Sequence, residues 1–158
     1  MTNPTATYRS WQKLPDNRLG NALFSLGMVA RVPYFGTVLP TVVRLEPGLC
    51  EVRAPKWYGI RNHLGTFHAI AACNLAEAAM GMLSEATVPT THRWIPKAMN
   101  VQYLTKANTG LRAVAELASI PDFTELTEGR DLVVPVSIYD RAGTEVVHAD
   151  ITTWVTPR

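Results

Sequence analysis

The sequence predicts an α+β fold in which an antiparallel sheet packs around one long, buried helix. Residues 62–84 open with a polar turn and continue with a run built almost entirely of Ala, Leu, Ile and Met. A helix that is apolar on nearly every side is buried. Alternating segments with turn signals between them lie on both sides of this helix and predict strands. At 158 residues, with 47% hydrophobic and 18% charged residues, the chain fits one domain with a single core.

The first 32 residues predict an N-terminal arm followed by a helix. We expect residues 1–15 to form an arm docked by Tyr8 and Trp11, and residues 16–158 to form the single domain. An Asp-Asn pair caps the helix predicted over residues 16–32, and Pro33 ends it. One face of this helix carries apolar residues at helical spacing: Leu19, Leu23, Leu26 and Ala30.

Six strands are expected, two before the central helix and four after it. Pro47-Gly48 joins the first two into a hairpin. We expect Lys97, Met99, Val101 and Tyr103 to share one face of the third strand, and Pro135 to mark an edge position or a bulge in the fifth. The strands are predicted at residues 38–46, 49–54, 92–106, 111–117, 132–139 and 144–155.

Glu77 is the candidate functional residue that stands out from the residues alone. It is the only charged residue between Arg61 and Glu85, inside a helix that the pattern buries. An ionised carboxylate is costly to bury without a partner. One sheet covers only one side of a helix that is apolar all round, so we also expect a second copy of the chain to cover the rest.

Composition and motifs narrow the class of protein. The net charge of +2 gives no argument for nucleic-acid binding, and no segment is long and apolar enough for a membrane span or a signal peptide. Cys50 and Cys73 are expected to be reduced core residues of a cytoplasmic protein. No spacing of cysteines and histidines predicts a metal site. We expect no metal or organic cofactor.

The segments NHLGTFHAIAACNLAEAAMG and RWIPKAMNVQYLTKA carry a resemblance to a known superfamily. With the hairpin before them and the strands after them, they resemble hotdog-fold thioesterases, both the phenylacetate-pathway type and an uncharacterised thioesterase-like family. The resemblance covers residues 38–158. It implies that the sheet wraps the helix, that two subunits pair to extend the sheet, and that an acyl-CoA thioester binds between them, with coenzyme A as part of the substrate.

The same resemblance implies a role for individual residues. Asn62 matches the asparagine that positions the thioester or the attacking water, and Glu77 matches the helix carboxylate that acts as general base or nucleophile. His68 and Ala69 match the start of the helix, where the Ala69 N–H polarises the thioester carbonyl. An N–H at a helix start suits the oxyanion that thioester hydrolysis develops. The implied substrate contacts are Gly65, Thr66, Ile70, Arg93 and Lys97.

Geometry and one departure from the pattern qualify this assignment. Glu77 lies about 12 Å along the helix from Ala69, too far for one helix to supply both groups, so a dimer or a dimer of dimers is expected. Ile70 stands where many active relatives have glycine and adds bulk where substrate approaches. A non-catalytic protein that binds acyl groups or acyl-CoA is therefore the alternative.

Each candidate also has a purely structural interpretation. Glu77 can belong to a solvated or interfacial stripe, and His68 can cap the helix. Asn62 and Gly65 can be ordinary turn residues. A hotdog dehydratase is disfavoured because the chain has no D-x-N-x-x-H motif, and a structural oligomer remains a further alternative.

In a hotdog protein, basic residues near the ends of the central helix could contact the phosphates of coenzyme A. These residues are Arg53, Lys56, Arg61, Arg93 and Lys97.

Overall fold

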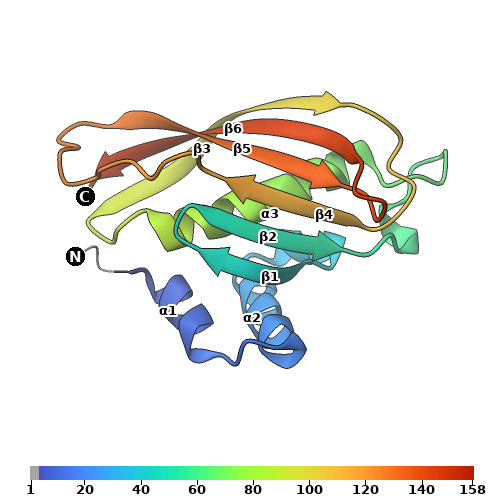
Figure 1. The fold of residues 1–158 in the computed structure, drawn as a ribbon, viewed down its shortest axis with the longest axis horizontal. Coiled ribbons are helices and arrows are strands. Elements are labelled where there is room, and N and C mark those ends of the chain that lie inside the picture. Colours follow the sequence, from blue (N-terminus) through green and yellow to red (C-terminus); the bar gives the residue numbers. More distant parts are fainter. Residues whose placement is uncertain (1–3) are drawn as a thin grey trace.

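A six-stranded antiparallel sheet curves over one long helix, α3, in the computed structural model, which describes residues 4–158 (Figure 1). The strand order is β1-β2-β4-β5-β6-β3, so β1 and β3 form the two edges. This arrangement confirms the predicted hotdog architecture. The strands are β1 (Thr41–Glu46), β2 (Leu49–Ala54), β3 (His92–Tyr103), β4 (Leu111–Glu116), β5 (Arg130–Tyr139) and β6 (Glu145–Pro157).

Helix α3 (Ala69–Thr87) supplies the centre of the core, and 13 of its 19 residues are buried. Leu75, Met80 and Leu83 are fully enclosed in the hydrophobic core. The remaining, partly exposed positions form a stripe that includes Ile70 and Glu77. The all-apolar sequence therefore predicted the burial correctly, with one stripe left open. Within residues 4–158, no helix is long and apolar enough to cross a membrane.

The first strand begins later than the sequence predicts. A 3₁₀ helix, η1 (Pro33–Val38), occupies the segment between the predicted helix and the predicted strand and includes Val38, the first residue predicted for the strand. Leu39 then adopts a left-handed conformation with φ of 48°, which interrupts the extended backbone. The strand therefore starts at Thr41 rather than at Val38. A second 3₁₀ helix, η2 (Tyr58–Ile60), precedes α3.

A β-bulge in β3 makes one prediction about its faces wrong. The register against β6 shifts between Pro96 and Ala98, so side chains before and after this point exchange faces. Met99 packs against the core, whereas Lys97 lies on the other face of the sheet. There Lys97 Nζ contacts both carboxylate oxygens of Asp131 at 3.0 Å and lies 5.0 Å from the centre of the Trp154 ring.

Pro135 lies in an interior strand, yet its missing N–H has a local explanation. β5 lies between β4 and β6. Its pairing with β4 extends only from Val136 to Tyr139, so Pro135 is the first residue beyond the end of that ladder. The residue still lies opposite Asp150 of β6. On the side facing β4, the part of β5 from Pro135 towards its N-terminal end is therefore unpaired, and proline is tolerated there as on an edge strand.

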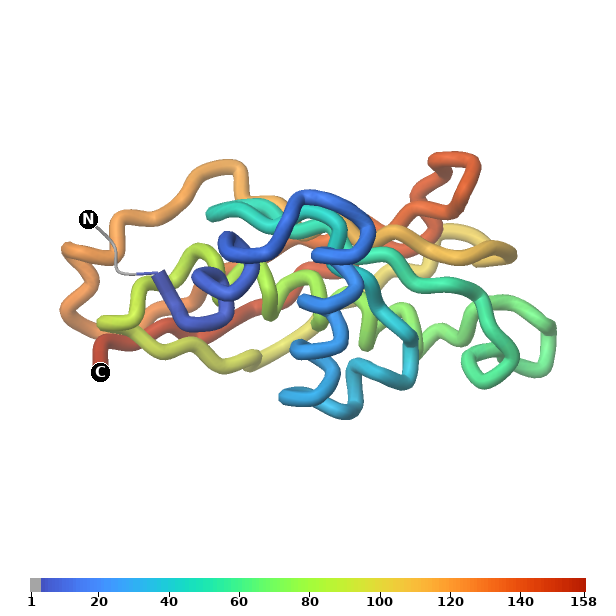
Figure 2. Tube along the Cα trace, turned by 90° about the horizontal axis from the view of Figure 1, so that it is seen from below, coloured from blue at the N-terminus to red at the C-terminus, as the bar shows by residue number. Residues whose placement is uncertain are grey.

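Two N-terminal helices pack below β1 and beside α3 (Figures 1 and 2). The expected arm contains α1 (Ala6–Lys13); residues 1–3 of that arm lie outside the described chain. The Trp11 ring meets the Phe24 ring edge-on at 5.1 Å, and Thr5 Oγ1 donates a hydrogen bond to the Glu85 carbonyl. α1 is therefore fastened to both α2 and α3.

Helix α2 (Arg18–Arg31) turns its leucine stripe to solvent instead of to the core. The residues that it buries are Gly20, Phe24, Ser25 and Met28. Leu19 and Leu26 are each about two-thirds exposed. The Ser25 hydroxyl shows why this face points inward: it accepts the Val42 N–H of β1 at 2.9 Å and fixes the helix against the strand.

Candidate functional site

The loop before α3 is held together by the side chain of Asn62. Asn62 Oδ1 accepts the N–H groups of Leu64 and Thr66 at 3.0 and 3.1 Å, and Nδ2 donates to Thr66 Oγ1 at 2.8 Å. Gly65 has φ of +72°, a conformation that favours glycine. Lys56 Nζ donates to the Gly65 carbonyl at 3.1 Å. Asn62, Gly65 and Thr66 are therefore brought together as one fixed turn.

Helix α3 begins with backbone donors that the rest of the described chain leaves unused. His68 is the N-cap, and its Nδ1 accepts the Ile70 N–H at 3.1 Å. The Ala72 N–H bonds to the His68 carbonyl. Within residues 4–158 the N–H groups of Ala69 and Ala71 have no hydrogen-bond partner. Free N–H groups at the positive end of a helix dipole stabilise an anion.

A hollow of about 400 Å³ lies beside this helix start. Its walls come from η1, from η2 with the residue before it, and from the first two turns of α3. The Trp57 Nε1–H donates to the Thr37 carbonyl at 3.2 Å and ties two of the walls together. The hollow is of the size that proteins use for small organic ligands. It is lined by Tyr34, Thr37, Trp57, Gly59, Ile60, Arg61, His68, Ile70, Ala71 and Asn74.

Asn74 anchors the η1 wall to the helix. Its Nδ2 donates to the Tyr34 carbonyl at 3.2 Å and to Thr37 Oγ1 at 3.0 Å. Asn74 is buried, so these bonds satisfy an amide that would otherwise be costly in the core. Sequence reasoning missed this role, although an isolated asparagine in an apolar helix was the available signal.

Glu77 lies half-buried on the open stripe of α3. One turn before it, the Cys73 thiol lies 3.2 Å from the Tyr103 hydroxyl of β3. One turn after it, the Trp94 ring of β3 covers Gly81, where an added Cβ would lie 3.5 Å from the ring. Glu77 therefore occupies a gap between two contacts of β3 with the helix. In the described chain its carboxylate has no hydrogen bond or ion pair.

The hydrogen bond between Cys73 and Tyr103 changes the acidity of the phenol. This bond, and to a lesser extent burial and the charge of the thiolate, raise the pKa of Tyr103 to about 12. The hydroxyl therefore stays protonated at neutral pH beside the Glu77 gap. Cys73 is only partly buried, so the prediction of a core cysteine is wrong for this residue and right for Cys50.

The structure separates the predicted site residues into three groups. The Asn62 turn and the start of α3 are adjacent, because the His68 N–H donates to the Ile60 carbonyl. Glu77 is eight residues further along α3, about 12 Å of helical rise from Ala69. Arg93 and Lys97 lie on β3, where Lys97 is paired with Asp131. A single chain therefore does not bring the carboxylate to the free N–H groups.

The fold and the position of this site define the chain as a hotdog-fold protein. The family described as a domain of unknown function, DUF4442, matches residues 20–155. The chain belongs to this family. It is 41% identical to the genomics protein APC5556 over 96% of each chain, with a TM-score of 0.80.

More distant structures share the fold. A Pseudomonas aeruginosa protein of unknown function, PA5026, described as a probable thioesterase, is 20% identical over the whole of both chains, with a TM-score of 0.76. The thioesterase SAV0944 of Staphylococcus aureus is 19% identical, with a TM-score of 0.68 over 79% of this chain and 99% of its own. A search of curated proteins found no match. The chain thus has the fold of hotdog thioesterases.

Proposed function

We propose that this protein hydrolyses an acyl-CoA thioester at a site formed between two copies of the chain. The observation that carries the proposal is the start of α3, where two N–H groups without partners lie beside a hollow of about 400 Å³. The oxyanion of the tetrahedral intermediate would accept the Ala69 N–H. The acyl group would occupy the hollow between Trp57 and Ile70.

A second copy would supply the carboxylate. Glu77 faces outward through a gap in its own subunit and lacks a partner in the described chain. β3 is an edge strand with mostly exposed side chains, so it offers the backbone groups for pairing with another β3. Such a dimer, alone or within a dimer of dimers, would carry the Glu77 of one subunit towards the α3 start of the other.

The proposed reaction uses few groups. Glu77 would act either as a general base that removes a proton from water or as a nucleophile that attacks the carbonyl carbon. The carbonyl oxygen would gain charge against the Ala69 N–H, and the thiolate of coenzyme A would leave and take up a proton. If Glu77 is the nucleophile, water would then hydrolyse the acyl anhydride on Glu77 to release the acid and restore the carboxylate. Asn62 would keep the turn in place and orient the carbonyl or the water through its remaining hydrogen-bonding capacity.

Thiol release from a panel of acyl-CoAs tests this function. The wild type should release thiol, and Glu77→Gln should lose about 10²-fold or more in kcat. The matched control is Glu85→Gln on the same helix, whose side chain bonds to Trp94 and should leave kcat unchanged. Absence of turnover with every acyl-CoA, or equal losses in both variants, would overturn the proposal.

One observation favours a non-catalytic acyl-binding protein as the second candidate. The Ile70 side chain is 57% exposed at the hollow, and its N–H is already occupied by His68. Bulk at this position narrows the approach to the carbonyl. Binding of acyl-CoA without thiol release, unchanged in Glu77→Gln, would select this candidate.

A further inference from the structure

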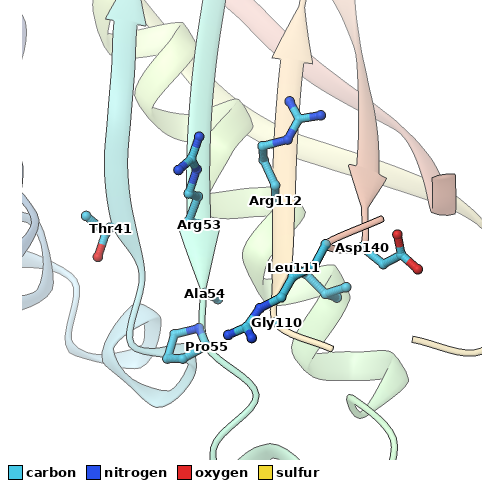
Figure 3. Close-up of a pocket in the computed structure, with 9 residues that line it drawn as sticks. Thr41, Arg53, Ala54, Pro55, Gly110, Leu111, Arg112 and Asp140 are labelled. Atoms are coloured by element: carbon cyan, nitrogen blue, oxygen red, sulfur yellow. The ribbon is translucent and has the colours of Figure 1, made fainter. Parts of the chain in front are cut away.

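A second hollow, of about 470 Å³, lies on the face of the sheet opposite α3 (Figure 3). It lies where β2 ends, β4 begins and β5 turns towards β6. Three arginines reach it from separate segments: Arg53 from β2, Arg112 from β4 and Arg141 from the β5–β6 turn. The other lining residues are Thr41, Ala54, Pro55, Gly110, Leu111 and Asp140.

Two of these arginines lie directly opposite each other on neighbouring strands, so an anion between them is favourable. Arg53 and Arg112 are direct partners in the antiparallel register, and like charges in that position repel each other. Glu51 lies between them: its carboxylate accepts Arg53 Nη2 at 2.9 Å and lies 3.5 Å from Arg112 Nη1. One carboxylate of the chain thus bridges the two guanidinium groups and offsets part of their repulsion.

The charges at the hollow do not balance. In the described chain, Arg141 forms no ion pair. The neighbouring Asp140 forms no ion pair with it, and Asp140 Oδ1 accepts the N–H groups of Ala142 and Thr144, which closes the turn. The three arginines around the hollow therefore outnumber the two nearby carboxylates, Glu51 and Asp140, and Glu51 is already paired with Arg53 and Arg112. A net positive charge remains at the mouth of the hollow.

The surroundings of the arginines are rigid. The Arg112 guanidinium stacks over the Tyr139 ring at 4.7 Å. The Arg141 N–H donates to Thr109 Oγ1 at 3.1 Å, which fixes the turn against the β4 side. Gly110 lies so close to β2 that an added Cβ would come within 2.9 Å of the Ala54 carbonyl oxygen. These contacts hold the Arg112 side chain and the Arg141 backbone in place, which lowers the cost of ordering when a ligand binds.

We propose that this hollow binds a phosphate group carried on a small organic body. Guanidinium groups match phosphate through paired N–H donors, and arginine is the residue preferred for that geometry. The hollow is much larger than a phosphate ion, and Leu111 and Pro55 give it an apolar part for the attached body. The phosphate can come from a free nucleotide or from coenzyme A. The site is separate from the α3 start and does not rest on the proposed hydrolysis.

Calorimetric titration of the whole protein at low salt tests this site with three probes: inorganic phosphate, ADP and coenzyme A. Arg112→Gln and Arg141→Gln should each weaken the Kd of the ADP complex about tenfold. The matched control is Arg44→Gln, an exposed arginine of β1 that pairs with Glu46 outside the hollow. Its Kd should equal that of the wild type.

The probes separate the possible sources of the phosphate. Tighter binding of ADP than of inorganic phosphate supports a nucleotide ligand, and still tighter binding of coenzyme A, with the same dependence on Arg112, supports the coenzyme. Equal binding of phosphate and ADP would show that the attached body contributes nothing and would overturn the proposal of an organic phosphate as the ligand. No binding of any probe to the wild type, or an equal loss in Arg44→Gln, overturns the proposal. None of the probes contains a thioester, so failure of hydrolysis would leave this result unaffected.

Discussion

His68 Nδ1 accepts the backbone N–H of Ile70 at 3.1 Å, and this bond decides which donors remain at the start of α3. The cap consumes the second N–H of the helix and leaves the first, that of Ala69, without a partner in the described chain. Because Nδ1 is the acceptor, the proton of the neutral imidazole lies on Nε2. The histidine thus acts on the backbone and leaves the Ala69 N–H free for the proposed oxyanion site.

Ala69→Pro removes the proposed oxyanion donor without removing the helix. Proline is favoured at the first helical position, and His68 before it has the extended conformation that proline requires (φ −64°, ψ 136°). The variant should keep the melting temperature of the wild type and lose about 10²- to 10³-fold in kcat. Ala69→Gly retains the N–H and is the control. Normal turnover in the proline variant would exclude this N–H as the donor.

Complementation between two inactive variants tests whether the site is shared by two subunits. Glu77→Gln and Ala69→Pro break different halves of each site, so a mixed dimer contains one intact site and one that lacks both groups. With random pairing, refolding the two variants together should restore about a quarter of the wild-type rate. The rate is measured as thiol release after co-refolding. No recovery, with mixed dimers demonstrated by mass spectrometry, would place both groups in one chain.

Asn74→Ala should loosen the η1 wall of the hollow. The change removes the two hydrogen bonds to Tyr34 and Thr37 and leaves the Tyr34 carbonyl with one donor fewer. We expect the free energy of unfolding to fall by about 1–3 kcal/mol. Urea denaturation measures this loss, with the exposed Asn108→Ala as the control. A loss no greater than that of the control would show that η1 is held by packing alone.

The pattern of apolar residues predicted both the sheet and α3. In α3 this was possible because the helix is buried on nearly all sides, so every turn of it consists mainly of apolar residues. The same reasoning did not predict which face of α2 is buried. There the leucines at helical spacing face solvent, while Gly20 and Ser25 face the core. Gly20 leaves room for the Pro15 carbonyl, and the Ser25 hydroxyl accepts the Val42 N–H of β1. Such tertiary contacts do not appear in a hydrophobic pattern.

The site was predictable in part for a similar reason. Asn62, Gly65 and His68 form local structure within a few residues, and local geometry follows from sequence. The bulge that moves Lys97 to the other face depends on how β3 pairs with β6, some 50 residues away. The arginine cluster joins residues from three separate segments through the register of the sheet. The face of Lys97 and the arginine cluster both depend on pairing between distant strands, so the local sequence does not predict them.

The contact between Tyr103 and Cys73 predicts a dependence of stability on pH. The hydrogen bond to Cys73, with burial second, raises the pKa of Tyr103 from 10.0 to about 12 in the folded protein. The folded state therefore holds this proton more tightly than the unfolded state. The resulting stabilisation is fully present below pH 10 and is lost as the pH rises from 10 to about 12.

Absorbance titration of tyrosinate measures this pKa directly. One of the tyrosines should ionise near pH 12 in the wild type, and Cys73→Ala should return it towards 10, because the largest cause of the shift is removed. Tyr103→Phe identifies the signal by eliminating it. Since Tyr103 lies at the end of β3 beside the proposed interface, the titration should be repeated in the presence of acyl-CoA. An unchanged high pKa in Cys73→Ala would assign the shift to burial instead of to the thiol.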